Sequence, residues 1–247
     1  MRVGFVGLGL MGTPMARAIA RAGFQLTVWA RRPEAVAGFS DAQVAASLTD
    51  LASRSDLLCI CVRDDAGVEE VVASARDSLP PDAAVVVHST VHPDTVRRIA
   101  ESGLRVLDAT VSGGPAAADR GALVVFAGGE RDLYEACLPV LSSYGDPVRL
   151  LGDVGAGQMA KLLNNLLFAT NLGAVRRVLA LATYHQLDSE TLSELFERSS
   201  AASFALSTSR RAPESFDVAQ ALLEKDLALL RTIVPGPLLD AAITNLQ

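Results

Sequence analysis

Residues 3–16 read VGFVGLGLMGTPMA, an apolar run that breaks into closely spaced glycines. The run predicts a buried strand at Val3–Gly7, and a helical stretch follows it. Glycines at such a turn match the dinucleotide-binding fingerprint: Gly7 makes the tight turn, Gly9 lets the backbone approach a pyrophosphate, and Gly12 lets helix and strand pack closely. One glycine pattern is weak by itself, so a plain strand-to-helix turn is the alternative.

The residues between these glycines are expected to take part in the same site. Leu10 and Met11 lie in the turn, just before the predicted helix. The N–H groups and the dipole at the start of a helix favour an anion such as a pyrophosphate. We therefore predict that Leu10 and Met11 contact the cofactor together with the glycines.

Strand and helix patterns alternate from Arg2 to about Ser142, which favours a Rossmann-type, doubly wound parallel α/β sheet. Several strand candidates are near-continuous apolar runs, as expected for strands buried on both faces. The remaining predicted strands are Gln25–Ala30, Leu57–Val62, Ala84–His88, Leu104–Asp108, Val124–Ala127 and Val148–Leu151. The predicted helices are Pro14–Ala22, Ala66–Ser78, Pro93–Glu101 and Arg131–Tyr144.

The character of the chain changes after Gly152, where no further strand is expected. Helical composition runs from Gln158 to about Tyr184, with further helices at Ser189–Glu197 and Val218–Leu230. We expect residues 1–153 to form the dinucleotide-binding domain and residues 154–247 to form an all-helical second domain, joined by the long helix.

The end of the second strand bears on the choice of cofactor. An acidic residue there commonly binds the ribose 2′-hydroxyl of NAD, whereas an arginine accommodates the 2′-phosphate of NADP. Here Arg31 and Arg32 come first, and the first acid is Glu34. We predict NADP(H) as the preferred cofactor, with NAD(H) as the alternative. Two solvated surface arginines would give the same sequence.

Polar residues follow later predicted strands, and ligands of open α/β sheets bind at the carboxyl edge of the strands. Thr90 follows one such strand. A second strand leads into Ser112-Gly113-Gly114, whose hydroxyl and approachable N–H groups suit a carboxylate. A plain turn would also explain this segment.

The long helix and a later helix carry the remaining candidates. Lys161 and Asn165 are four residues apart among Ala, Leu and Met, so they share one partly buried helix face. Lys225-Asp226 lies in the later helix and could equally be an exposed charge pair.

These motifs, in this order, resemble the β-hydroxyacid dehydrogenase family, which includes 3-hydroxyisobutyrate dehydrogenase and tartronate semialdehyde reductase, across nearly the whole chain. The resemblance rests on residues 4–16, Asp108–Gly114 with Gly121, Gly155–Asn165 and Lys225-Asp226. It implies a dinucleotide-binding domain followed by a helical domain, a small carboxylate substrate, and a homodimer or homotetramer.

The same resemblance assigns roles to individual residues. It implies that Lys161 is catalytic and that Asn165 positions the substrate. Further positions are implied at the substrate carboxylate (Ser112, Gly113, Gly114), at the nicotinamide end of the cofactor (Thr90, Lys225) and elsewhere along the cofactor (Val62 and, for NADP, Arg31).

This chain departs from the family pattern in three places. Thr110 stands where a proline is usual, and Ala30 stands where an asparagine commonly precedes the cofactor arginine. The segment Leu230–Pro237 is tighter than expected, and the C-terminal part looks short. The shortening puts the substrate-pocket wall and the oligomer interface in doubt.

The bulk composition excludes some other classes. With a net charge of −6, a pI of about 5.1 and no basic run, a nucleic-acid surface is not expected. Three scattered cysteines form no disulfide framework and suit a reducing cytoplasm. No apolar run predicts a membrane span. A signal peptide at the N-terminus is the alternative, against which the glycines and Pro14 argue.

The sequence therefore predicts an enzyme that transfers a hydride between NADP(H) and a small β-hydroxyacid or its semialdehyde, with Lys161 as general acid and base. Two alternatives stay open: an NADP-binding protein without catalysis, and a related reductase of imines or larger ketones. The presence of Lys161 disfavours the second of these.

Overall fold

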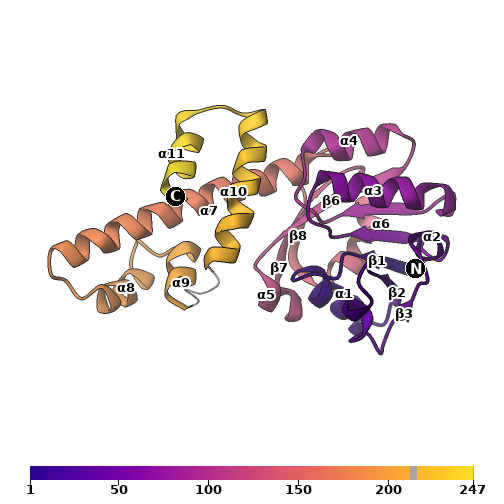
Figure 1. Cartoon of the computed structure of the whole chain (residues 1–247), viewed down its shortest axis with the longest axis horizontal. Helices are drawn as coiled ribbons and strands as arrows, with labels where there is room; N and C mark the ends of the chain where they lie inside the picture. Colours follow the sequence, from indigo (N-terminus) through magenta and orange to yellow (C-terminus); the bar gives the residue numbers. More distant parts are fainter. Residues whose placement is uncertain (212–215, 247) are drawn as a thin grey trace. The chain divides into compact units, whose positions relative to one another are not determined.

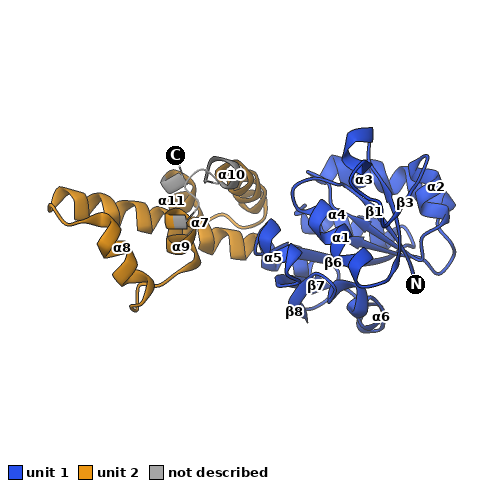
Figure 2. Cartoon of the chain, turned by 90° about the horizontal axis from the view of Figure 1, so that it is seen from below, with its two compact units in different colours: residues 1–161 blue, residues 162–247 orange. Residues whose placement is uncertain are grey.

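The computed structural model describes residues 1–211 and 216–246, which form two compact units (Figure 2). The first unit is Met1–Lys161 and the second is Leu162–Gln247. The sequence places the domain boundary at residue 153. In the structure, the start of the long helix belongs to the first unit, because it packs and hydrogen-bonds onto the sheet.

The first unit is built on an eight-stranded sheet with the order β3-β2-β1-β4-β5-β6-β7-β8 (Figure 1). The predicted strands are all present, and β3 is an addition. The strands are β1 (Arg2–Val6), β2 (Gln25–Trp29), β3 (Gln43–Val44), β4 (Leu57–Ile60), β5 (Ala84–Val87), β6 (Arg105–Ser112), β7 (Leu123–Gly128) and β8 (Gly145–Leu150).

The doubly wound arrangement is confirmed, with one departure from a purely parallel sheet. β7 pairs antiparallel with β6, with Asp108 opposite Gly128 and Ser112 opposite Val124. Every other neighbouring pair is parallel. The short helix between β6 and β7 does not provide the long crossover that a parallel connection needs, so the chain reverses instead.

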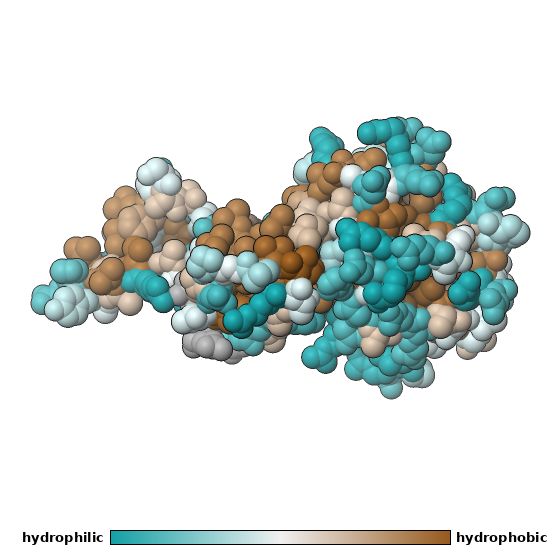
Figure 3. Space-filling model, turned by 90° about the horizontal axis from the view of Figure 1, so that it is seen from above, coloured by the Kyte–Doolittle hydropathy of each residue, from teal (hydrophilic) through white to brown (hydrophobic). Residues whose placement is uncertain are grey.

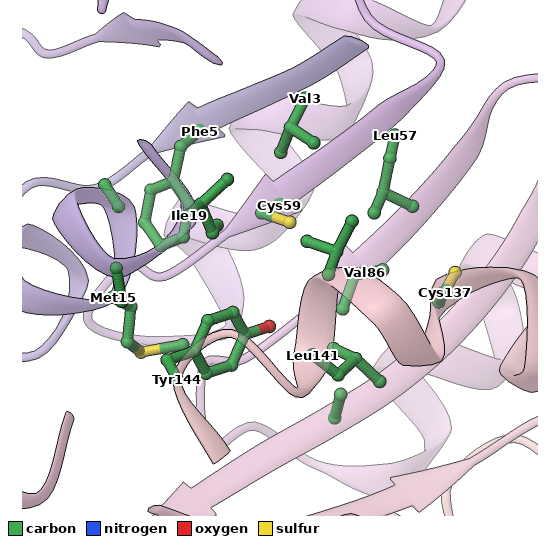
Figure 4. Packing of buried hydrophobic residues seen from close by; sticks show 14 of the residues in the cluster. Val3, Phe5, Met15, Ile19, Leu57, Cys59, Val86, Cys137, Leu141 and Tyr144 are labelled. Atoms are coloured by element: carbon green, nitrogen blue, oxygen red, sulfur yellow. The ribbon is translucent and has the colours of Figure 1, made fainter. Parts of the chain in front are cut away.

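Alternate side chains of the central strands enter opposite layers of the core, as the pleat requires. Cys59 and Val86 lie in one cluster with α1 (Gly12–Arg21) and α6 (Arg131–Leu141). Figure 4 shows Met15 and Ile19 of α1 beside Phe5, and Leu141 and Tyr144 on the same side. The other layer packs Leu58, Ile60, Val85 and Val87 against α2 (Leu48–Ser53), α3 (Asp65–Ala75) and α4 (Pro93–Glu101).

Several short elements were not predicted, because they hold too few residues to show a periodicity. They are β3, α2, α5 (Pro115–Asp119) and the 3-10 helix η1 (Pro33–Val36). The predicted helix Ala66–Ser78 ends as a 3-10 turn, η2 (Arg76–Ser78), after α3. A signal for α2 does exist in the sequence. Ser47 is followed by Asp50, and the Ser47 hydroxyl accepts a hydrogen bond from the Asp50 N–H at 3.0 Å.

The predicted strand Leu104–Asp108 ends too early. β6 continues to Ser112, and the turn starts only at Gly113. Pairing with β7 extends the strand by several residues beyond the edge that β5 sets.

The second unit is helical in its described part, as predicted. The long helix is α7 (Ala156–Tyr184), which starts in the first unit, and the others are α8 (Ser189–Glu197), α9 (Phe204–Arg211), α10 (Phe216–Ile233) and α11 (Pro237–Leu246). α9 and α11 were not predicted.

By length and composition alone, α7 could cross a membrane, and it is the one such helix among the residues described. A core helix of a water-soluble protein passes the same test. This helix carries Lys161, Asn165 and the adjacent Arg176 and Arg177.

Candidate active site

The glycine turn after β1 has the geometry that a dinucleotide requires. Gly7 has a positive φ of 97°, and a methyl group on it would overlap the Cys61 carbonyl. A methyl group on Gly12, the first residue of α1, would overlap the Gly7 carbonyl. At Gly9 no atom lies within 4 Å of such a methyl group, so this stretch of backbone is open to a ligand.

Leu10 and Met11 lie at the open side of this turn. Leu10 is 64% exposed, although it is a large apolar residue. Met11 is the N-cap of α1 and makes no side-chain capping bond. The start of α1 is thus available to an anion, and these residues fit a bound pyrophosphate.

A second edge loop is fastened beside the glycine turn. The Ser89 hydroxyl, which follows β5, accepts a hydrogen bond from the Val62 N–H at 2.8 Å. Val62 follows β4 and directly succeeds Cys61, the residue that Gly7 packs against. The loops after β1, β4 and β5 therefore meet at one carboxyl edge, and Thr90 lies in the last of them, half-buried.

The start of α7 is anchored to the sheet by Asp108 in β6. Its two carboxylate oxygens accept hydrogen bonds from the Gly155 and Gln158 N–H groups, each at 2.7 Å. Burial raises the pKa of Asp108 to about 6, while these backbone hydrogen bonds limit the rise. Asp108 thus satisfies donors that the first turn of a helix would otherwise leave unpaired.

Thr110, where the family pattern has proline, provides another attachment. Its buried hydroxyl donates a hydrogen bond to the Gly157 carbonyl at 2.8 Å. A proline side chain has no hydrogen-bond donor, so a proline at this position could not make this contact.

The predicted carboxylate-binding segment forms a turn at the end of β6. Ser112 is half-buried at the end of the strand, while Gly113 and Gly114 have positive φ angles of 131° and 77°. Gly114 is the N-cap of α5 and has no atom within 4 Å of an added methyl group. The backbone of this turn is accessible to a ligand.

Arg31 and Arg32 follow β2 and are both exposed. One Arg31 nitrogen lies 3.9 Å from a Glu70 carboxylate oxygen, an exposed pair at the limit of an ion pair. Such a pair contributes little, so Arg31 remains available to a phosphate.

Lys161 and Asn165 are one turn apart in α7, and both are at least half-buried. In the second unit, the Asn165 amide donates to one Asp226 carboxylate oxygen at 2.6 Å, and Lys225 Nζ lies 2.8 Å from the other. Lys225 and Asn165 are therefore linked through Asp226, which is buried.

Sequence reasoning assigned no role to Asp108, Gln158 or Asp226, although each lies in a motif quoted above. Asp226 could have been suspected, because it follows Lys225 directly. For Asp108 and Gln158 the sequence gives no signal, since their partners lie 47 to 69 residues away. Within the described residues, no group of three or more His, Cys, Asp or Glu side chains is placed to hold a metal.

The fold and the open glycine turn define a class: a Rossmann-type dinucleotide-binding protein with a helical second domain. Comparison with known families narrows the class. The NAD binding domain of 6-phosphogluconate dehydrogenase matches residues 2–152, and the NAD-binding domain of NADP-dependent 3-hydroxyisobutyrate dehydrogenase matches residues 155–237. The chain belongs to the β-hydroxyacid dehydrogenase family, and it is an NAD(P)-dependent oxidoreductase.

Individual relatives agree with this assignment. The 3-hydroxyisobutyrate dehydrogenase of Pseudomonas aeruginosa is 34% identical over 213 residues, covering 83% of this chain and 72% of that protein. The NAD-dependent L-serine dehydrogenase of the same organism is 33% identical over 214 residues, with the same coverage.

A solved structure of Mycobacterium tuberculosis 3-hydroxyisobutyrate dehydrogenase with L-serine has a TM-score of 0.88 and 26% identity, covering 99% of this chain and 92% of that one. The expected family and fold are thus confirmed.

Proposed function

We propose that this enzyme transfers a hydride between NADP(H) and a small β-hydroxyacid or the matching semialdehyde acid, with Lys161 as general acid and base. The observation that carries the proposal is the attachment of α7. Asp108 and Thr110 hold its first turn against the sheet that bears the glycine turn, and Lys161 follows directly.

The choice of lysine at this position supports a proton-transfer role. The chain has 22 basic residues, of which only Lys161 and Lys225 are lysines, and the other 20 are arginines. Arginine is effectively never deprotonated in proteins, whereas lysine can release and accept a proton.

Each side chain of the proposed site has its own role in the reaction. When bound, the nicotinamide supplies or accepts the hydride. In reduction, Lys161 as an ammonium donates a proton to the carbonyl oxygen, and in oxidation it accepts the hydroxyl proton. The Asn165 amide has two N–H donors, and with one bound to Asp226 the other can hold the reacting oxygen. The hydroxyl and N–H groups of Ser112, Gly113 and Gly114 bind the carboxylate and orient the acid.

Along the cofactor, we assign Gly7, Gly9, Leu10, Met11, Gly12 and Val62 to its backbone, Thr90 and Lys225 to its nicotinamide end, and Arg31 with Arg32 to its 2′-phosphate. The exposure of both arginines supports the last assignment. Arg31→Gln should weaken NADPH binding by about tenfold or more and leave NADH binding within about twofold, because a charged hydrogen bond to phosphate contributes about 1.5–3 kcal/mol. Equal weakening of both cofactors would refute the assignment.

The activity test uses the purified chain with NADPH and NADH against glyoxylate, succinic, tartronate and methylmalonate semialdehydes, and with NADP⁺ and NAD⁺ against L-serine and 3-hydroxyisobutyrate. A cyclic imine is the control. Turnover of an acid with NADPH preferred is expected. NADPH binding without turnover of any acid would contradict the proposal, and turnover of the imine alone would favour an imine reductase.

The scarcity of lysine allows a direct test of where the substrate binds. An amine-reactive reagent can modify only Lys161, Lys225 and the chain's α-amino group. Peptide mass spectrometry should show that NADP⁺ with the hydroxyacid protects Lys161, whereas the acid does not change modification of the α-amino group. Unchanged modification of Lys161 would argue against contact with substrate.

We further propose that the enzyme is a homodimer or homotetramer that acts in the cytoplasm. Several large apolar side chains are exposed on α7, among them Leu167 (62%) and Leu181 (59%), and a second copy would cover them. The three cysteines are free, which suits a reducing compartment. Leu181→Glu should reduce the mass measured by light scattering, whereas Leu151→Glu in the sheet unit should not. An unchanged mass for Leu181→Glu would remove this face from the interface.

A further inference from the structure

We infer that Gln158 is a positioning residue, which fixes Lys161 relative to the loops that receive the cofactor. The inference rests on the proposed function and deepens it, because it concerns how the proton donor is held. Gln158 is the third residue of α7, and its side chain and backbone are completely buried.

The Gln158 side chain fastens the loop after β5 from both sides of Thr90. Its Oε1 accepts a hydrogen bond from the Val91 N–H at 2.9 Å, and its Nε2 donates one to the Ser89 carbonyl at 2.9 Å. These contacts join segments 67 and 69 residues apart in sequence. The Thr90 backbone is therefore held between two bonds to one side chain.

The contacts continue from that loop to the glycine turn. Ser89 accepts the Val62 N–H, and Val62 succeeds Cys61, whose carbonyl packs against Gly7. A continuous series of short contacts thus runs from Gly7 to Gln158, entirely within the first unit. Because ligands of this fold bind along this edge, the series joins the cofactor loops to α7.

The backbone of Gln158 is fixed as well, since its N–H donates to Asp108. Lys161 lies three residues further along α7, on the same face of the helix as Gln158. Any rotation of the first turn would therefore move the Lys161 side chain relative to the loop. A misplacement of about 1 Å can lower turnover about 100-fold.

The chemistry of the site explains why glutamine stands here. The loop presents one N–H donor and one carbonyl acceptor, and a side-chain amide supplies both complements at once. Asparagine is one methylene shorter, ionised glutamate lacks the donor, and methionine fills a similar volume without either bond. Gln158→Met therefore removes the two bonds with little change in volume, and Gln25→Met, at an exposed glutamine of β2, is the matched control.

The experiment combines kinetics with hydrogen exchange of the ligand-free chain. In Gln158→Met, the Val91 and Val62 N–H groups should exchange about tenfold faster or more, since the hydrogen bonds that hold the loop are lost. The kcat should fall at least about tenfold, while KM for the acid and Kd for NADPH stay within about threefold. Gln25→Met should change none of these quantities.

Faster exchange with unchanged kcat would overturn the inference, since Gln158 would then only stabilise the loop. An equal loss of NADPH affinity and kcat would overturn it too, because that pattern marks a collapsed cofactor site. If the wild-type chain turns over no acid, the proposed function fails, and the fluorescence of bound NADPH still tests Gln158. A changed nicotinamide emission in Gln158→Met at equal Kd supports positioning, whereas identical emission refutes it.

Discussion

The two units hold their polar groups in different ways. In the sheet unit, Asp108, Thr110 and Gln158 bind backbone N–H and carbonyl groups far away in sequence. In the helical unit, Asn165 and Lys225 are arranged around the buried side chain of Asp226. The partners in the sheet unit are backbone groups, and the fold fixes their positions. In the helical unit these contacts join side chains to one another, so a single substitution can remove them.

Their surfaces differ as well. Of the 15 exposed large hydrophobic residues in the described part of the chain, 11 belong to the helical unit, although it is the smaller one. On the face shown in Figure 3, brown side chains are prominent on the helical unit, whereas much of the sheet unit is teal. The sheet unit buries most of its apolar residues in two clusters, whereas the helical unit leaves many large apolar side chains exposed.

The largest effect is expected at the end of the sheet unit. Lys161→Ala should lower kcat by about 10²- to 10⁴-fold, because the proposed general acid and base is lost, while the Kd for NADPH stays within about threefold. Lys161→Arg should be nearly as impaired, since arginine keeps the charge but does not release a proton. Stopped-flow kinetics and NADPH fluorescence measure both quantities.

Arg177→Ala, an exposed residue of the same helix, is the control and should retain full activity. Wild-type turnover in Lys161→Arg would mean that charge alone suffices.

One variant in each unit, Asp108→Ala in the sheet unit and Asp226→Ala in the helical unit, tests the stability of the two units separately. Trp29, the single tryptophan, lies in β2 and reports on the sheet unit alone. Asp108→Ala should lower the free energy of unfolding from Trp29 fluorescence by about 2–4 kcal/mol, since buried N–H groups of α7 lose their acceptor. Asp226→Ala should leave the Trp29 unfolding transition unchanged. It should lower the denaturant concentration at which part of the helical circular dichroism signal is lost. Equal shifts of both signals in both variants would show that the units unfold together.

Acidification should weaken the sheet unit through His88. The buried ring lies between the Ala109 carbonyl and the Tyr144 hydroxyl, and burial lowers its pKa to about 4. The unfolded chain, with a histidine pKa near 6.5, binds the proton first, so the free energy of unfolding falls as pH drops from about 6.5 to 4.

The loss through His88 amounts to about 3 kcal/mol. Asp108, whose pKa is raised to about 6, acts in the opposite direction between pH 4 and 6. The comparison must therefore be with His88→Gln at each pH, whose stability relative to the wild type should rise on acidification. A pH-independent difference would contradict the prediction.

The smallest effect is expected at Thr110. Thr110→Val removes one buried hydroxyl with little change in volume, and should lower the stability of the sheet unit by about 1 kcal/mol. The Gly157 carbonyl, which lies within the helix, keeps its place, so kcat should change less than about threefold. The Trp29 denaturation midpoint and steady-state kinetics measure both. A loss of kcat as large as that of Gln158→Met would assign Thr110 a positioning role as well.

Local pattern determined most of what could be predicted. The strands and the main helices follow from apolar runs and periodicity, and the roles of Gly7 and Gly12 follow from backbone freedom at one turn. The order of the motifs identified the family. Elements of two to six residues, such as β3 and α2, were missed because segments this short cannot show a hydrophobic periodicity.

Only the tertiary structure decided which motifs meet. Asp108 and Gln158 lie in separate motifs of the sequence. No local pattern predicts that β6 continues past Asp108 or that the first turn of α7 packs against Asp108. β6 lies between β5 and β7, and Asp108 is buried there. Because an unpaired buried donor is costly, polar groups that are distant in sequence form hydrogen bonds with one another. The sequence by itself determined the main strands and helices, the glycine turn and the candidate lysine. The sheet decided how that lysine is held, because long-range hydrogen bonds depend on strand order and have no sequence period.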